Sequence, residues 1–174
     1  MYDYFQETDS DGSVGYVFVT KHNIIYTIAF DFTLYQRYLD NSPVLLGNSY
    51  GLGIYPEPSP SIQDSDVSIT IIDIIRDFFF IAAKTSFILY HCDYKDGKQH
   101  LRDRIFRSWH KLANKDGAIF RYNLEVEIRD ENNQGVKHYI GFICRDDNET
   151  RIEAEQEFTT FSVEFIAVDG KIPE

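Results

Sequence analysis

The feature that most constrains the fold is a short apolar stretch that leads through an acidic turn into a long amphipathic segment. Residues 87–92 are apolar at nearly every position. A strand that is apolar on both faces is typical of the centre of a sheet with a covering layer on each side. Residues 93–97 supply turn residues, and the segment from residue 98 to 112 has helical spacing. We therefore expect a central strand followed directly by a packed helix.

The second half of this stretch also predicts how the helix is oriented. At about 100° per residue, one side carries most of the apolar residues, Leu101, Ile105, Trp109 and Leu112, with Phe106 and Ala113 flanking them. The opposite side carries Arg104, Arg107, His110 and Lys111. Arg102 lies within the apolar side, and a guanidinium keeps its proton, so in the interior it must bond to acceptors. We expect Arg102 to enter the core and to be held by Asp93 and Asp96.

The remaining pattern predicts an α+β fold. Alternating apolar residues indicate strands within residues 1–57, and residues 68–84 have the pattern of a buried helix. After the central strand and its helix, a long hairpin and a third helix complete the order β-β-β-β-α-β-α-β-β-α. The expected sheet is mixed, mostly antiparallel, with about six or seven strands and three helices. The 174 residues suit a single domain, residues 1–174, with a strand meander at 1–57 and a helix and strand core at 68–167.

Two aspartates on the first expected helix point to a polar cluster. Asp73 and Asp77 lie one turn apart, which is unfavourable unless a cation is near. Arg76 is close enough in sequence to pair with Asp73, and Arg102 is a second possible counter-ion. We expect a structural polar cluster in the core, made of Asp73, Asp77, Asp93, Asp96 and Arg102.

The charge balance favours one class of partner over another. The formal net charge is −11, which disfavours direct binding of nucleic acid over a broad surface and attracts basic partners. We expect a non-enzymatic binding or regulatory module, of the inhibitor or immunity type, that engages a basic protein. The carboxylates expected to steer that partner are Glu125, Glu127, Asp130, Glu131, Asp146, Asp147 and Glu149.

A hydrolytic function is the alternative. Carboxylates at the end of a central strand, just before a helix, lie where α/β domains often bind ligands. Asp93 and Asp96, with Arg102 beside them, could hold Mg²⁺ for phosphoester hydrolysis by a small phosphoesterase or nuclease. Capping and ion pairing explain the same residues without a metal. No common hydrolase or nucleotide-binding motif occurs in the chain.

The few cysteines and histidines do not suggest a cofactor or metal site. Cys92 and Cys144 lie in expected strands at apolar positions, which indicates two reduced, buried thiols. His138 lies on the inner face of the expected hairpin, where a hydrogen-bonded core histidine is favoured over a ligand. No membrane-spanning run or signal pattern is found, so a cytoplasmic location is expected. The oligomeric state is left open.

One stretch resembles a known family. Residues 90–109, from Tyr90 through Cys92, Asp93, Asp96 and Gly97 to Trp109, are similar to the Y-x-C-D-x-x-D-G … R-x-R-x-F-x-x-W core of an uncharacterised bacterial domain family of unknown function. Residues 70–79 are similar to it as well. The resemblance covers about a fifth of the chain and implies no activity. It implies only that this stretch forms the core of such a family.

Overall fold

The computed structural model describes residues 1–60, 64–92, 94–129 and 134–169. Its strands are β1 (Tyr4–Thr8), β2 (Val14–Val19), β3 (Ile25–Asp31), β4 (Ser49–Glu57), β5 (Phe87–Cys92), β6 (Ile119–Arg129) and β7 (Gly135–Arg145). Its helices are α1 (Ser65–Ile81), α2 (Gln99–Ala113) and α3 (Arg151–Asp169), together with the short 3-10 helix η1 (Gln36–Tyr38). This α+β order and its three helices confirm the predicted fold class.

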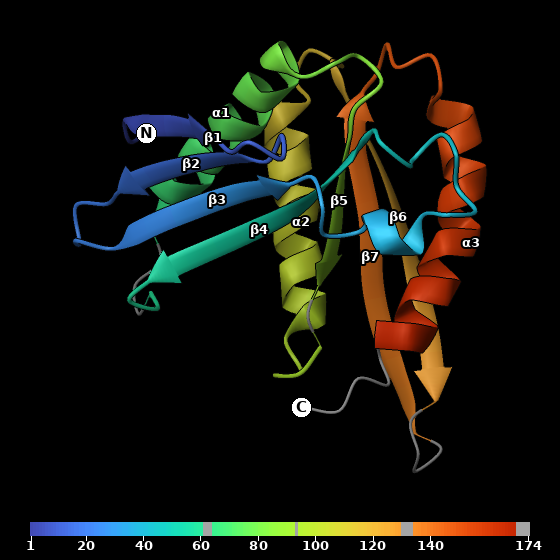
Figure 1. The fold of residues 1–174 in the computed structure, drawn as a ribbon. Coiled ribbons are helices and arrows are strands. Elements are labelled where there is room, and N and C mark those ends of the chain that lie inside the picture. The colour runs from blue at the N-terminus through green and yellow to red at the C-terminus, as the bar shows by residue number, and fades with distance from the viewer. Residues whose placement is uncertain (61–63, 93, 130–133, 170–174) are drawn as a thin grey trace.

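The strands form one seven-stranded sheet in the order β1-β2-β3-β4-β5-β7-β6 (Figure 1). Only β4 and β5 pair in parallel, and α1 connects them; every other neighbouring pair is antiparallel. Parallel neighbours need a crossover connection, and α1 supplies it. The sheet is therefore mixed and mostly antiparallel, as the sequence predicts, with β4 in the middle of the order and β5 as its interior neighbour.

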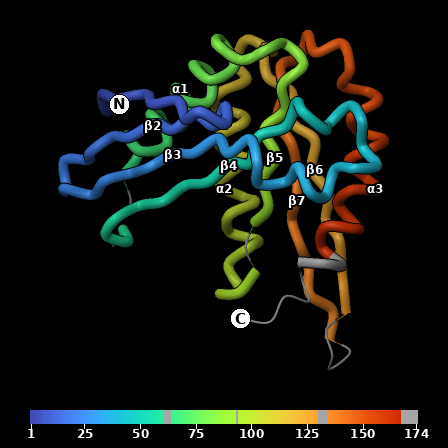
Figure 2. The backbone as a smooth tube through the Cα atoms, in the orientation of Figure 1, coloured from blue at the N-terminus to red at the C-terminus, as the bar shows by residue number. Residues whose placement is uncertain are grey.

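Helices cover both faces of the sheet, which gives two apolar cores. On one face, α1 and α2 pack over side chains such as Tyr16, Phe30 and Tyr90. On the other face, α3 and the segment around η1 pack over Phe87 and Phe142, and Figure 2 shows this segment running from β3 to the α3 side before it returns to β4. Because both faces are covered at β5, its side chains are buried in both directions, as expected of a central strand.

Several expected surfaces are confirmed. Tyr26, Ile28 and Phe30 on β3 are buried in alternation. The phenylalanine row of α3, including Phe158 and Phe161, is 0% and 1% exposed and forms the centre of the second core. A strand with an alternating apolar face has its register determined by burial, because a shift of one residue would turn that face outward. None of the helices in the described residues is long and apolar enough to cross a membrane.

The orientation of α2 differs from the prediction. Its buried residues are Asp103 and Ala113, whereas Ile105 and Leu112 are 45% and 46% exposed. The inner side of the helix therefore lies about a third of a turn from the expected one. The core beneath α2 is already filled by aromatic rings, among them Tyr90, which stacks on Phe106 with centroids 4.6 Å apart. That contact determines the orientation of the helix more than the number of aliphatic residues on one side.

Candidate functional site

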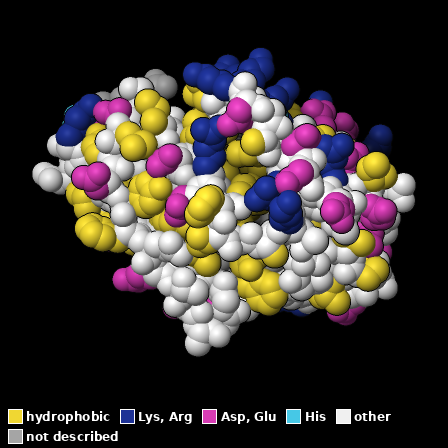
Figure 3. All heavy atoms as spheres, turned by 90° about the horizontal axis from the view of Figure 1, so that it is seen from above, with side chains coloured by type: hydrophobic (Ala, Val, Ile, Leu, Met, Phe, Trp, Pro, Cys, Tyr) yellow, Lys and Arg dark blue, Asp and Glu magenta, His cyan; other side chains and the backbone are white. Residues whose placement is uncertain are grey.

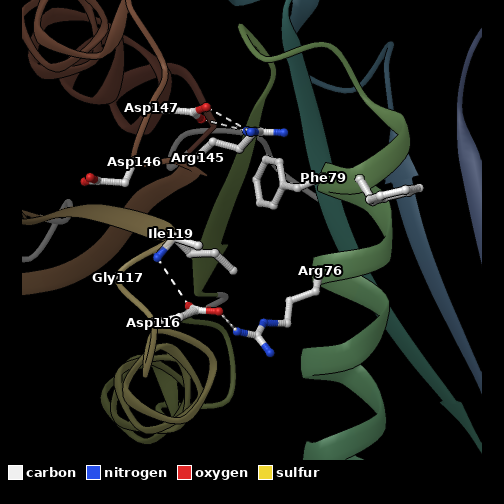
Figure 4. Close-up of a pocket in the computed structure, with 10 residues that line it drawn as sticks. Arg76, Phe79, Asp116, Gly117, Ile119, Arg145, Asp146 and Asp147 are labelled. Atoms are coloured by element: carbon white, nitrogen blue, oxygen red, sulfur yellow. Dashed lines mark hydrogen bonds and ion pairs between the residues drawn. The ribbon is translucent and has the colours of Figure 1, made fainter.

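A cleft lies at the end of the sheet where α1 and α2 finish. It has a volume of about 440 Å³ and is lined by Arg76, Phe79, Phe80, Asp116, Gly117, Ala118, Ile119, Arg145, Asp146 and Asp147. Figure 4 shows that these residues come from the last turns of α1, the turn between α2 and β6, and the end of β7. Segments distant in sequence therefore form the site only after the sheet and both helices are in place.

Two ion pairs hold opposite sides of this cleft. Arg76 Nη2 lies 2.6 Å from Asp116 Oδ2. Arg145 binds both carboxylate oxygens of Asp147, at 2.7 and 2.9 Å. Lys84 lies 3.4 Å from the same carboxylate. The cleft is thus bordered by charges of both signs, and Figure 3, which views this end of the molecule, shows them around a hollow with apolar side chains.

Two carboxylates of the cleft, those of Asp116 and Asp147, have lowered pKa values. The hydrogen bond from the Ala118 amide, helped by Arg76, lowers the pKa of Asp116. The hydrogen bonds from Arg145 lower the pKa of Asp147 to about 2, and Lys84 adds to the effect. Hydrogen bonding to a charged form stabilises that form. A guest in the cleft therefore meets Asp116 and Asp147 in their charged form, beside the guanidinium groups of Arg76 and Arg145.

The helix ends add negative potential. α1 ends at Ile81 and α2 ends at Ala113, so both helices direct the carbonyl groups of their last turns towards this end of the molecule. The C-terminal end of a helix carries a partial negative charge of about half an elementary charge. The three aspartates among the lining residues each have a cationic partner, and Lys84 and Arg151 join the two lining arginines in these pairs. Because the side-chain charges are paired, the two helix C-termini supply the potential that favours a positively charged guest.

An exposed aromatic side chain lies beside the charges. Phe80 is 86% exposed, while its neighbour Phe79 is 4% exposed and packs into the core. Both line the cleft. Exposed aromatic rings offer an apolar surface and a face that attracts cations. The site combines carboxylates, helix C-termini and an available ring.

The structure places the predicted catalytic residues differently. Arg102 binds Asp96 through both oxygens, at 2.7 and 2.8 Å, so the pairing of Arg102 with the acidic turn is confirmed. The expectation that Arg102 enters the interior is wrong, because its side chain is 38% exposed and that of Asp96 is 43% exposed. The two hydrogen bonds also lower the pKa of Asp96. Asp93 lies outside the described residues.

The described members of the expected polar cluster take part in separate contacts. Asp73 accepts a hydrogen bond from Tyr4 at 3.0 Å, and Asp77 accepts one from Tyr16 at 3.0 Å. The first contact joins α1 to β1 and the second joins it to β2, and neither includes Asp96 or Arg102. Arg76 binds Asp116 and not Asp73. The phenol hydroxyls of Tyr4 and Tyr16 stabilise the two neighbouring carboxylates in place of a cation. No pattern in the sequence indicated these partners.

The predicted binding carboxylates fall into two groups at opposite ends of the β6–β7 hairpin. Glu125 and Glu127 lie in the second half of β6, and Glu125 pairs with Lys137 at 2.6 Å. Asp146, Asp147 and Glu149 follow β7 at the cleft end, and Asp146 binds Arg151 at 2.8 Å. At about 3.3 Å per residue, the groups are roughly 25 Å apart. Asp130 and Glu131 lie outside the described residues.

A buried ion pair that sequence reasoning missed lies under α2. Arg121 binds Asp103 at 2.9 Å, and the two side chains are 6% and 1% exposed. Arg121 also donates to the Tyr90 hydroxyl at 2.7 Å, and Arg107 is a second partner of Asp103. The missed signal was helical spacing, since Asp103 falls in line with Phe106, the neighbour that stacks on Tyr90.

The structure also places the predicted cysteines and the predicted core histidine. Cys92 and Cys144 are free and buried. His138 is 3% exposed, and its Nδ1 lies 3.4 Å from Nε2 of His91, so it is a hydrogen-bonded core histidine as expected. Across the ranges the structure describes, no group of three or more His, Cys, Asp or Glu side chains is arranged to hold a metal ion.

Comparison with known proteins gives one match. A model of a family of unknown function, DUF6169, matches residues 63–158, from the linker before α1 to the middle of α3. The matched range includes both stretches whose resemblance to an uncharacterised family is noted above. No curated protein and no solved structure matches the chain.

Proposed function

Because this chain belongs to DUF6169, a family of unknown function, we propose a function from the site itself: the protein is a non-enzymatic binding module for a basic protein partner. A lysine or arginine side chain of that partner enters the cleft at the ends of α1 and α2. The observation that carries this proposal is the joint presence of carboxylates, two helix C-termini and the exposed ring of Phe80 around one cavity.

Each component favours a cation for its own reason. The carboxylate of Asp146 has one oxygen bound to Arg151, at 2.8 Å, and a second that can accept another donor. The Phe80 ring can cover the aliphatic part of a lysine or the plane of a guanidinium. The net charge of −11 increases the rate at which a basic partner arrives. Arg76 and Arg145 limit the attraction, so affinity is expected to be moderate and selective for the shape of the partner.

The test is a titration of the isotopically labelled protein with hexalysine, followed by amide chemical shifts. The expected result is a saturable shift at Phe80, Gly117 and Ala118, and no comparable shift with hexaglutamate. Binding should weaken as salt rises, because exposed charges more than about 8 Å apart are screened at physiological ionic strength.

Two matched variants distinguish binding at the cleft from general attraction to an acidic protein. Asp147→Asn removes a carboxylate from the cleft, and Glu125→Gln removes one from the hairpin, where Lys137 is its partner. The two carboxylates are similarly exposed, at 50% and 47%. We expect Asp147→Asn to weaken hexalysine binding about two- to fivefold, the range of an exposed charge pair, and Glu125→Gln to leave it unchanged. Equal weakening in both variants would refute binding at the cleft.

A further inference from the structure

The outer side of α2 carries an apolar row beside a basic row. Leu101, Ile105 and Leu112 lie close together around the helix, and the last two are 45% and 46% exposed. Arg104 and Lys111 form the neighbouring row and are exposed. Neither of these two cations forms an ion pair with any residue in the described part of the chain. This surface is separate from the cleft.

The outer side of α3 carries the complementary arrangement. Ile152 and Val163 lie on one side of the helix and are 64% and 52% exposed. Glu153 and Glu164 form the neighbouring row and are exposed. As far as the structure describes the chain, these two glutamates have no ion-pair partner. An acidic row therefore lies beside an apolar row on α3.

The exposed apolar residues have the same spacing on α2 and on α3. Leu101 and Leu112 are eleven residues apart, as are Ile152 and Val163, which is about 16 Å along each helix. When these apolar pairs are matched in a parallel contact, Arg104 and Lys111 each lie within about 3 Å, along the axis, of a glutamate of α3.

The handedness agrees as well. Both helices are followed around their axes in the direction in which the chain winds. The basic row then comes before the apolar row on α2, and the acidic row comes after the apolar row on α3. Two parallel helices that face each other then have both charged rows on the same side, whereas an antiparallel contact separates them.

We propose that α2 of one copy packs in parallel against α3 of a second copy. The two helices lie on opposite faces of the sheet (Figure 1). The contact is therefore heterologous: each molecule uses one face to bind and offers the other, so association continues head to tail. One helix pair buries less than the roughly 1,200–2,000 Å² of stable interfaces, so the contact is weak and grows with concentration.

A second copy fits better than another anionic surface. The phosphates of a nucleic acid would pair with Arg104 and Lys111 but would leave the apolar row of α2 uncovered. The net charge of −11 opposes approach to an anionic membrane. Repulsion between two copies is screened beyond about 8 Å at physiological ionic strength, whereas the proposed contact brings the basic and acidic rows side by side.

The test is sedimentation of the full chain from about 10 μM to about 1 mM, the range of a weak contact. The mean mass of the wild type should rise with concentration. A variant of the α2 surface, Ile105→Asp with Leu112→Asp, and a variant of the α3 surface, Ile152→Asp with Val163→Asp, should each remain monomeric. An equimolar mixture of the two should form a dimer and grow no further, because one intact α2 meets one intact α3.

The controls distinguish this contact from others. Ile69→Asp changes a residue of α1 that is 47% exposed and should leave association intact. Circular dichroism of each variant checks that the helices are retained. A wild type that is monomeric at every concentration, or a mixture of variants that stays monomeric, would overturn the proposal. Hexalysine binding at the cleft does not depend on either outcome, because the two sites share no residue.

Discussion

Arg121 on β6 reaches Asp103 on α2 across 2.9 Å, and solvent is almost excluded from both side chains. The guanidinium also binds Tyr90 on β5 and Asn123 on its own strand, at 2.7 and 3.1 Å. One buried cation thus joins the helix to two strands. A buried charge is tolerated only when its partners are complete, because removing one partner leaves the other charge without compensation.

Asp103→Ala is therefore expected to lower the free energy of unfolding by about 3–5 kcal/mol, the usual cost of breaking a buried pair. Urea denaturation gives this value. Adding Arg121→Met to that variant should recover much of the loss, because the unpaired charge is then gone. The control is Asp96→Asn, whose partner Arg102 is 38% exposed; this change should cost much less, because solvent screens an exposed pair. Equal losses at the two sites would contradict the role given to burial.

The tyrosines that contact α1 predict a loss of stability in alkali. Burial and the hydrogen bond to Asp73 raise the pKa of Tyr4 from 10.0 to about 12, and burial with Asp77 raises the pKa of Tyr16 in the same direction. In the unfolded chain these phenols release their protons near pH 10. Stability is therefore fully present below pH 10 and is lost as pH rises towards 12, because the unfolded state binds fewer protons.

Tyr4→Phe tests this linkage. The variant should be less stable than the wild type at pH 8 by about 1 kcal/mol, the net value of one hydrogen bond, and its stability should fall less steeply between pH 10 and 12. Chemical denaturation across this pH range measures both. Tyr55→Phe is the control, since Tyr55 is 62% exposed and its replacement should leave the pH dependence unchanged.

The buried His138 predicts a loss of stability in acid. Burial lowers its pKa from 6.5, since desolvation disfavours the charged ring. The unfolded chain then binds a proton at a higher pH than the folded chain does. The stabilising contribution is complete above pH 6.5 and declines as pH falls from 6.5 through the lower pKa of the folded state. His138→Asn should flatten the decline in stability below pH 6.5, whereas the exposed His100→Asn should not; thermal melts from pH 7.5 to 5 compare them.

The sequence predicted the parts of the fold that depend on local periodicity. The alternation on β3, around Ile28, and the aromatic row of α3, around Phe158, are recognisable because burial on one side repeats every two residues or every turn. Element order followed from the same patterns. These patterns can be recognised without knowing which helix packs on which strand.

Orientation between elements could not be predicted in the same way. Leu112 was expected inside and Asp103 was not singled out, because an aliphatic residue usually packs and a carboxylate usually does not. Arg121 reverses this preference by supplying a buried partner from a strand eighteen residues later. The cleft was missed for a related reason: Arg76, Asp116 and Arg145 come from three separate segments, and no spacing in the sequence indicates that they meet.

A glycine on β7 provides the last prediction. A side-chain carbon at Gly141 would lie 2.3 Å from the Tyr90 hydroxyl and 2.6 Å from the backbone oxygen of Tyr122. The backbone oxygen belongs to the neighbouring strand and cannot move aside cheaply, so Gly141→Ala should lower the free energy of unfolding by about 1–3 kcal/mol, the usual cost of overpacking. Gly15 on β2 has nothing within 4 Å of the same position. Gly15→Ala should therefore be neutral or add up to about 1 kcal/mol, because alanine restricts the unfolded chain. Urea denaturation of the two variants checks the difference, and a Gly141→Ala protein as stable as Gly15→Ala would show that β7 can move away from β6.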